Sequence, residues 1–134
     1  KLSLLVTDID HFKNVNDTYG HDVGDVVIKG LGAILRKAKR DTDIVARFGG
    51  EEFCVLCEET DTAGAVKLAE RIREELGQTV FPTELGKLTV TGSIGVATFP
   101  NDARSGAELF KVTDQALYAA KRGGRNRVCT SKDL

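Results

Sequence analysis

The stretch that decides the fold reads Arg47-Phe48-Gly49-Gly50-Glu51-Glu52-Phe53. Apolar segments of strand length and composition flank it, Ile44-Val45-Ala46 before and Phe53-Cys54-Val55-Leu56 after. A glycine pair favours the positive φ angles of a tight two-residue turn, so the pattern predicts a β-hairpin that carries acid at its tip. An ordinary hairpin turn needs no carboxylates, and adjacent like charges repel unless a cation lies between them. The tip therefore indicates a site for a divalent cation.

A second acidic segment follows the first apolar run of the chain. The run Leu2-Ser3-Leu4-Leu5-Val6 predicts a strand buried on both faces, and it leads into Thr7-Asp8-Ile9-Asp10. Asp8 and Asp10 share one strand face, and the carbonyl of Ile9 between them is a further hard oxygen. Mg²⁺ prefers such oxygens and usually leaves positions for water and substrate phosphates. Asp8 with Glu51 therefore predicts a metal site for a nucleoside triphosphate, and the alternative is that Asp8 and Asp10 only cap the next helix.

Several ordered motifs of the chain resemble those of a GGDEF domain, the domain of diguanylate cyclases. They are Asp8-Ile9-Asp10-His11-Phe12-Lys13, Asn16 to Asp25, Arg47 to Phe53, Ser93 to Ala97, and Asp114 to Asn126. The resemblance covers essentially the whole chain, and it implies that residues 1–134 form one catalytic domain. Family members usually carry a further helix and an Asp-x-Leu-Thr-Gly-Leu-x-Asn-Arg-Arg loop just upstream. We therefore expect a fragment that lacks this helix and loop, and also an upstream sensor or regulatory domain.

Helical and strand patterns alternate along the chain. Apolar periodicity predicts helices at about residues 12–18, 23–39 and 63–76, with Gly20 and Gly24 marking the break between the first two. A capping box of Ser105 and Glu108 opens a further helix that ends near residue 122. Residues 88–91 and 93–97 predict one long strand or two pieces, and a short strand near 126–129 completes the sheet. This is an α/β (α+β) sandwich with an antiparallel-rich sheet, and the resemblance implies a ferredoxin-like palm shared with nucleotidyl cyclases.

Composition excludes several classes of protein. The 134 residues are 41% hydrophobic and 29% charged, as expected of a single globular domain, and no stretch approaches transmembrane length. A net charge of −1 argues against a nucleic-acid binder, so no nucleic-acid partner is expected. Because no stretch has transmembrane length, no membrane contact is expected within this segment. Three cysteines fit a reduced, cytoplasmic setting, and this is compatible with the cytoplasmic domain of a larger, membrane-attached protein. Cys54 and Cys57 have CxxC spacing, but on a strand they face opposite sides, which favours buried apolar roles over metal or redox chemistry.

The resemblance implies condensation of two GTP molecules into cyclic di-GMP with release of two pyrophosphates. Asp8, Glu51 and the Ile9 carbonyl would hold Mg²⁺, with Mn²⁺ as an alternative, and Glu52 would assist metal binding or deprotonate the attacking hydroxyl. His11, Phe12 and Lys13 open a helix whose N–H groups can bind phosphates. Gly49 and Gly50 complete the substrate site, together with Lys121 and Arg125 as cations on the triphosphate. For Lys121 the alternative is a cation that only stabilises the end of a helix.

Guanine selection is expected at Asn16 and Asp25. Asp accepts from the N1–H and N2–H₂ groups of guanine, and Asn donates and accepts, so the pair would discriminate against adenine. Without the resemblance, Asp25 reads as a solvated helix position. Aspartate at this position points to cyclic di-GMP, because family members that make mixed GMP–AMP dinucleotides carry serine there.

Product inhibition is expected at Arg40-Asp41-Thr42-Asp43, which matches the RxxD motif of the family. Arg40 and Asp43 would bind cyclic di-GMP, with Arg71 as the secondary arginine. The alternative is a surface ion pair between Arg40 and Asp43, which contributes little energy.

Two domains must face each other to join two GTP molecules, so the resemblance implies a homodimer. We expect the isolated chain to be largely monomeric and weakly active. The main alternative function is a catalytically inactive module that binds GTP or cyclic di-GMP, and a weaker one is a scaffold whose acids are surface charge.

Overall fold

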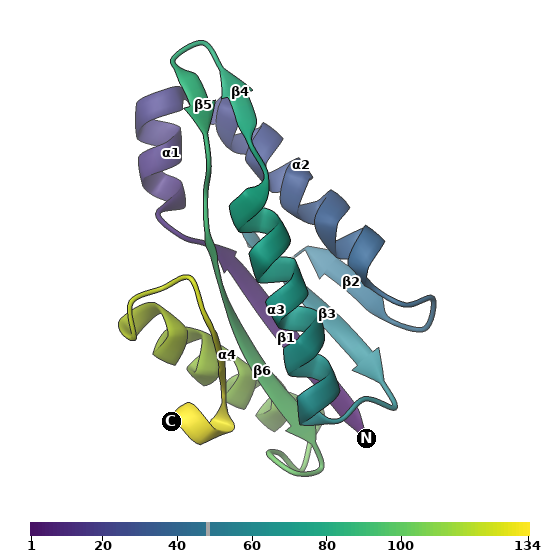
Figure 1. Cartoon of the computed structure of the whole chain (residues 1–134). Coiled ribbons are helices and arrows are strands. Elements are labelled where there is room, and N and C mark those ends of the chain that lie inside the picture. The colour runs from purple at the N-terminus through teal and green to yellow at the C-terminus, as the bar shows by residue number, and fades with distance from the viewer. Residues whose placement is uncertain (48) are drawn as a thin grey trace.

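The computed structural model describes residues 1–47 and 49–134. The strands are β1 (Leu2–Ile9), β2 (Ile44–Arg47), β3 (Glu52–Glu58), β4 (Phe81–Thr83), β5 (Gly86–Leu88), β6 (Gly92–Phe99) and β7 (Val128–Thr130). The helices are α1 (Phe12–Tyr19), α2 (His21–Ala38), α3 (Thr62–Gln78) and α4 (Gly106–Arg122), and a short 3₁₀ turn, η1 (Ser131–Asp133), follows β7. Figure 1 shows a central sheet with α3 lying across one face and a small hairpin, β4–β5, projecting beyond it.

The main sheet has the strand order β2-β3-β1-β6-β7. β1 lies at its centre and pairs antiparallel with both β3 and β6, while β7 joins β6 in parallel. The elements from β1 to β3, with α3 and β6, form the four-stranded ferredoxin-like arrangement, and α4 with β7 extends it. The predicted fold class is confirmed, and so is the burial of β1 on both faces, since every residue after Leu2 in this strand is buried.

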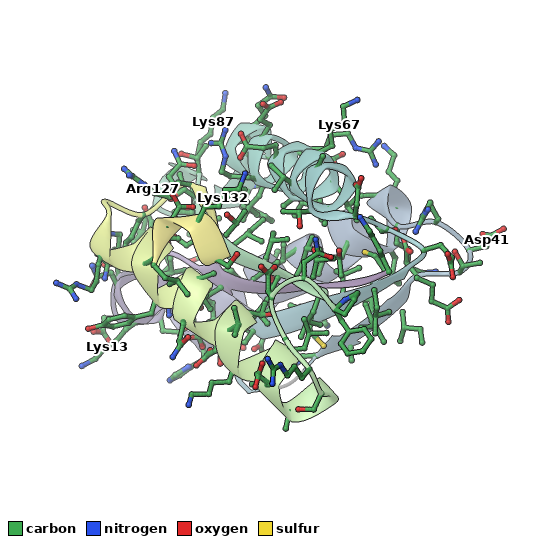
Figure 2. All side chains as sticks on the ribbon, turned by 90° about the horizontal axis from the view of Figure 1, so that it is seen from below. Lys13, Asp41, Lys67, Lys87, Arg127 and Lys132 are labelled. Carbon is green, nitrogen blue, oxygen red and sulfur yellow. The ribbon has the colours of Figure 1, made fainter. Side chains whose placement is uncertain are left out.

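Helices cover the sheet from both sides (Figure 2), with α3 on one face and α4 on the other. The larger core joins α2 and α3 to Leu5, Val55 and other sheet residues, and a smaller core joins α4 to Leu4 and Val6. Cys57 belongs to the first core and Cys54 packs against the second, so the two cysteines do face opposite sides as predicted. All three cysteines are free.

Close packing of α4 on β6 depends on Gly95. A Cβ added there would lie 2.3 Å from both the backbone nitrogen of Leu117 and the carbonyl oxygen of Thr113. Backbone atoms of a packed helix cannot retreat as a flexible side chain does, so glycine is what allows α4 to approach the sheet.

The expected two-residue turn and the expected helix break at Gly24 were both wrong. The hairpin turn is longer than two residues, because Gly49, Gly50 and Glu51 all lie outside the strands, and only Gly49 of the glycine pair has a positive φ, 73°. Arg47 stabilises this turn by donating from Nε and Nη2 to the carbonyl oxygen of Gly50, at 3.1 and 2.7 Å. Phe48, which follows Arg47, lies outside the described residues. Gly24 does not break the helical pattern, since it is buried inside α2 and only Gly20 separates α1 from α2.

The β4–β5 hairpin was not predicted from the sequence. Its two strands have three residues each, too few to show an alternating pattern. Phe81 attaches it to α2, where Gly30 leaves the space for its ring: a Cβ at residue 30 would lie 2.7 Å from Phe81 Cε1. Of the predicted strand residues 88–91 only Leu88 lies in a strand, at the end of β5, whereas residues 93–97 all lie in β6, which begins at Gly92.

Candidate functional site

An acidic site forms where β1, β3 and α4 meet. Asp8, near the end of β1, is directly opposite Glu52 on β3 in the strand register. Lys121, in the last turn of α4, donates from Nζ to Asp8 Oδ2. The Asp8 side chain is 8% exposed and the Lys121 side chain 33%. Residues 113 positions apart therefore form one site, in which the charge of Lys121 offsets the repulsion between the cross-strand carboxylates of Asp8 and Glu52.

Burial and charge shift the acid–base properties of this site. Burial, followed by the negative charge of Asp8, raises the pKa of Glu52 even though Lys121 opposes the shift. For Lys121, burial alone would lower the pKa, but the hydrogen bond and the charge of Asp8 outweigh it and raise the pKa. Asp114 also acts on Glu52, a neighbour that the sequence analysis missed because nothing in its helical position sets it apart. Glu52 is thus a carboxylate with enhanced affinity for a proton.

The site has a free oxygen that a cation would satisfy. Asp8 Oδ1 is buried and has no hydrogen-bond partner, although a buried carboxylate oxygen normally has one. Glu51 and Glu52 are half-buried in the adjacent hairpin, and Gly49 lies so close to Glu52 that a Cβ there would be 3.2 Å from Glu52 Oε1. Among residues 1–47 and 49–134, no group of three or more His, Cys, Asp or Glu side chains has the spacing to hold a metal ion. Asp8 Oδ1 fits a cation, while the predicted set of Asp8, Glu51 and Glu52 is not gathered around one point.

Asp10 has a different environment from Asp8, and the expectation that the two share a strand face was wrong, because β1 ends at Ile9 and Asp10 lies in the turn that follows it. It is 6% exposed, and both of its oxygens accept hydrogen bonds: Oδ1 from Ser93 Oγ, and Oδ2 from Thr91 Oγ1 and the backbone nitrogen of Asn126. Neither aspartate caps α1, whose N-cap residue is His11 and has no side-chain cap. The capping alternative for Asp8 and Asp10 is therefore wrong.

The N-terminal turn of α1 is open. His11 precedes the helix with φ 55° and is exposed, Lys13 is exposed, and Phe12 packs against the core. Because no side chain caps this end, the first N–H groups of the helix are available to an anion. Ile9, the last residue of β1, leads into this turn and its side chain is buried in the core.

The predicted guanine-selecting residues lie on α1 and α2. Asn16 Oδ1 is buried and has no hydrogen-bond partner, whereas Asp25 is exposed on α2. Gly24, next to Asp25, leaves the space in which the Asn16 amide lies: a Cβ at residue 24 would be 1.9 Å from Asn16 Oδ1. This contact was not predicted because Gly24 was assigned to the break between two helices, whereas a glycine inside a helix would have indicated close packing. Asn16 therefore presents an unsatisfied acceptor.

The predicted inhibitory residues lie away from the acidic site, between α2 and β2 and on α3. Asp43 is buried, and it accepts hydrogen bonds from the backbone nitrogen and Nη2 of Arg40, both at 2.9 Å. Arg40 also donates to the carbonyl oxygen of Glu58 at 2.8 Å. Arg71 donates to the carbonyl oxygen of Ala38 at 3.1 Å. The Arg40–Asp43 ion pair that the sequence offered as the alternative is thus present. It is not a pair of two surface residues, because Asp43 is buried and only Arg40 is exposed.

Comparisons with known proteins identify the class of this chain. The family described as "Diguanylate cyclase, GGDEF domain" matches residues 1–127, so the chain belongs to the GGDEF domain family. Diguanylate cyclase A of Treponema denticola is 43% identical over 98% of this chain, which covers 36% of that protein. Cyclic di-GMP phosphodiesterase NbdA of Pseudomonas aeruginosa is 39% identical over 93% of this chain, which covers 16% of it. The chain therefore spans about a third or less of these curated relatives.

Solved structures give the same fold. The GGDEF domain of DgcB from Caulobacter crescentus, in complex with c-di-GMP, matches with a TM-score of 0.91 and 36% identity, covering 98% of this chain and 78% of that one. The active GGEEF domain of a diguanylate cyclase from Vibrio cholerae matches with a TM-score of 0.88 and 37% identity, covering 97% and 82%. No helix formed by the described residues has the length and apolar character needed to cross a membrane.

Proposed function

We propose that this chain is the catalytic domain of a diguanylate cyclase, which condenses two GTP molecules into cyclic di-GMP and releases two pyrophosphates. The observation that carries the proposal is Asp8, a buried carboxylate with one unpartnered oxygen, opposite Glu52 and in contact with Lys121. Such a cluster at the end of a central strand suits the transfer of a nucleotidyl group, which requires anionic ligands for a metal and cations for phosphates. The curated relatives named as diguanylate cyclases support it.

Asp8, Glu51 and the carbonyl of Ile9 would hold Mg²⁺, or Mn²⁺ in its place. When bound, the metal neutralises phosphate charge and lowers the pKa of the ribose 3′-hydroxyl. Glu52 suits the role of proton acceptor for that hydroxyl, because its raised pKa makes it a stronger base than an ordinary glutamate. Lys121 and Arg125 would pair with the triphosphate, whose outer phosphates would also accept from the N–H groups that open α1 and from Lys13.

One domain binds one GTP in this proposal, so two domains must bring their substrates together. The active form is therefore a homodimer, and the rate per domain rises with protein concentration. Cyclic di-GMP would bind at Arg40, Asp43 and Arg71 as product and inhibitor. The Arg40 guanidinium already donates hydrogen bonds to Asp43 and to the carbonyl oxygen of Glu58. Binding of the ligand therefore requires some of these hydrogen bonds to be replaced by bonds to the ligand.

The test is turnover of GTP by this chain and by two variants. In the presence of Mg²⁺ we expect cyclic di-GMP and pyrophosphate, and Glu51→Gln should abolish both, because it keeps the shape of the side chain and removes an anionic ligand. Glu58→Gln is the matched control, since Glu58 is exposed at the far end of β3, the strand that begins just after Glu51. Tight GTP binding without any turnover would favour the inactive binding module instead. Full activity of Glu51→Gln would remove Glu51 from the metal site.

A further inference from the structure

The loop that carries Arg125 has an unusual backbone. Residues 123–127 connect α4 to β7, and Gly124, Arg125 and Asn126 follow one another with positive φ angles of 118°, 64° and 46°. Residues other than glycine adopt this left-handed conformation at a cost, although asparagine tolerates it better than most. Two consecutive non-glycine residues in it require contacts that hold them there.

Those contacts come from both sides of the loop. The backbone nitrogen of Asn126 donates to Asp10 Oδ2 at 2.9 Å, and its side-chain oxygen accepts from Arg73 Nη1 of α3 at 3.0 Å. On the side nearer α4, the backbone nitrogen of Arg125 donates to the carbonyl oxygen of Ala120 at 3.0 Å. Asn126 is therefore held between the end of β1 and α3, with Arg125 as its immediate neighbour.

Asp10 is itself fixed. Thr91 Oγ1 donates to its Oδ2 at 2.7 Å and Ser93 Oγ to its Oδ1 at 2.6 Å, and its backbone nitrogen donates to the carbonyl oxygen of Thr91 at 2.9 Å. A buried carboxylate with both oxygens engaged is a rigid anchor, and hydrogen bonds to a charged acceptor are the strong ones. It differs in this from Asp8, two residues earlier, whose Oδ1 is free.

We propose that Asp10 is a positioning residue: through the backbone of Asn126 it fixes the left-handed loop that carries Arg125, four residues after Lys121, and so holds Arg125 where it can bind the triphosphate of the substrate. This inference rests on the proposed function, since GTP is the ligand. Asp10 acts as a hydrogen-bond acceptor in this role and not as a metal ligand. The guanine-selecting residues lie on α1 and α2 and do not share these contacts, so loss of the anchor weakens triphosphate binding selectively.

The experiment compares two ligands by titration calorimetry: 3′-deoxy-GTP with Mg²⁺, which cannot condense, and GMP, which lacks the outer phosphates. Asp10→Ala should weaken binding of 3′-deoxy-GTP by about tenfold or more and change GMP binding by less than about twofold. Asp10→Asn should stay within about threefold of the wild type for both ligands, because its oxygen still accepts from Asn126 and the Ser93 hydroxyl can turn to accept from its amide. Ser93→Ala is a graded comparison: it removes the bond to Asp10 Oδ1 but keeps the bonds of Thr91 and Asn126 to Oδ2, so it should weaken 3′-deoxy-GTP binding less than Asp10→Ala does.

Equal loss of both ligands in Asp10→Ala would overturn the inference, as would an Asp10→Asn variant as weak as Asp10→Ala, which is the behaviour of a metal ligand. If Asp10→Ala does not fold, Thr91→Val takes its place: it keeps the shape of the side chain and removes the hydrogen bond that Thr91 Oγ1 donates to Asp10 Oδ2, the oxygen that holds the loop. A several-fold loss confined to 3′-deoxy-GTP supports the inference, and unchanged binding overturns it. If the wild-type chain binds neither nucleotide, the proposed function is overturned as well. If the wild type binds both, and the ratio of the affinities for 3′-deoxy-GTP and GMP is the same in the variants, only the positioning role is overturned.

Discussion

Replacing Gly24 with alanine should displace the Asn16 amide and leave the fold intact. The new Cβ would lie 1.9 Å from Asn16 Oδ1, 3.1 Å from Asn16 Cγ and 3.2 Å from Phe12 Cζ. The atoms in the way are the far ends of two side chains, which can rotate, and alanine is favoured over glycine inside a helix by about 1 kcal/mol. This gain offsets the cost of moving Asn16 and Phe12, so the free energy of unfolding should change by no more than about 1 kcal/mol.

Guanine binding should fall in the same variant. Loss of the hydrogen bonds of Asn16 to the base costs about 1–3 kcal/mol, which is about 5- to 150-fold in affinity. The assay is titration calorimetry with GMP and AMP, alongside urea unfolding of each protein. Gly77→Ala is the control, since Gly77 lies in α3 with nothing within 4 Å of its added Cβ. GMP binding at wild-type strength in Gly24→Ala, or an equal loss for AMP, would refute the reasoning.

Three further predictions concern stability and inhibition. Gly95→Ala should lower the free energy of unfolding by about 2–4 kcal/mol, measured by urea denaturation, because its Cβ meets backbone atoms of α4 that cannot move aside; a loss below about 1 kcal/mol would show that α4 can shift. Arg40→Ala should raise the steady-state level of cyclic di-GMP without changing the initial rate, and equal affinity of wild type and variant for cyclic di-GMP would place the inhibitory site elsewhere. Burial alone would raise the pKa of Asp43, but the hydrogen bonds and charge of Arg40 outweigh burial and lower it. Ionised Asp43 therefore stabilises the fold at pH values above its unfolded pKa of about 3.9. This stabilisation is lost as the pH falls through the lower pKa of the folded state. Asp43→Asn should therefore be about 1–3 kcal/mol less stable than wild type near neutral pH, with the gap closing below about pH 4, and a gap independent of pH would contradict this account.

The sequence predicted what depends on local pattern. β1 could be predicted because an apolar run without alternation indicates burial on both faces, α3 because its apolar spacing is helical, and α4 because the spacing of Ser105 and Glu108 matches a capping box. The capping box was half right: Ser105 Oγ accepts from the backbone nitrogen of Glu108, but Glu108 Oε1 accepts from Arg104 rather than from Ser105. The reciprocal bond depends on how the chain enters the helix, which spacing does not specify.

The remaining features depend on contacts between distant segments. Lys121 of α4 contacts Asp8 of β1, and the sequence alone named each of them without establishing the contact. Asp10 and Asp8 have the same place in the strand pattern, yet one is saturated by hydrogen bonds and the other is not. That difference arises from Thr91, Ser93 and Asn126, which only the folded chain brings next to Asp10.

The most direct test of the account is the stoichiometry and concentration dependence of GTP turnover by this chain with Mg²⁺. Pyrophosphate and cyclic di-GMP are measured together over a range of protein concentrations, in wild type and in Glu51→Gln. The account predicts two pyrophosphates for each cyclic di-GMP, a rate per domain that rises with protein concentration as dimers form, and no product from Glu51→Gln. GTP binding without cyclic di-GMP at any protein concentration, or product formation that persists in Glu51→Gln, would contradict it.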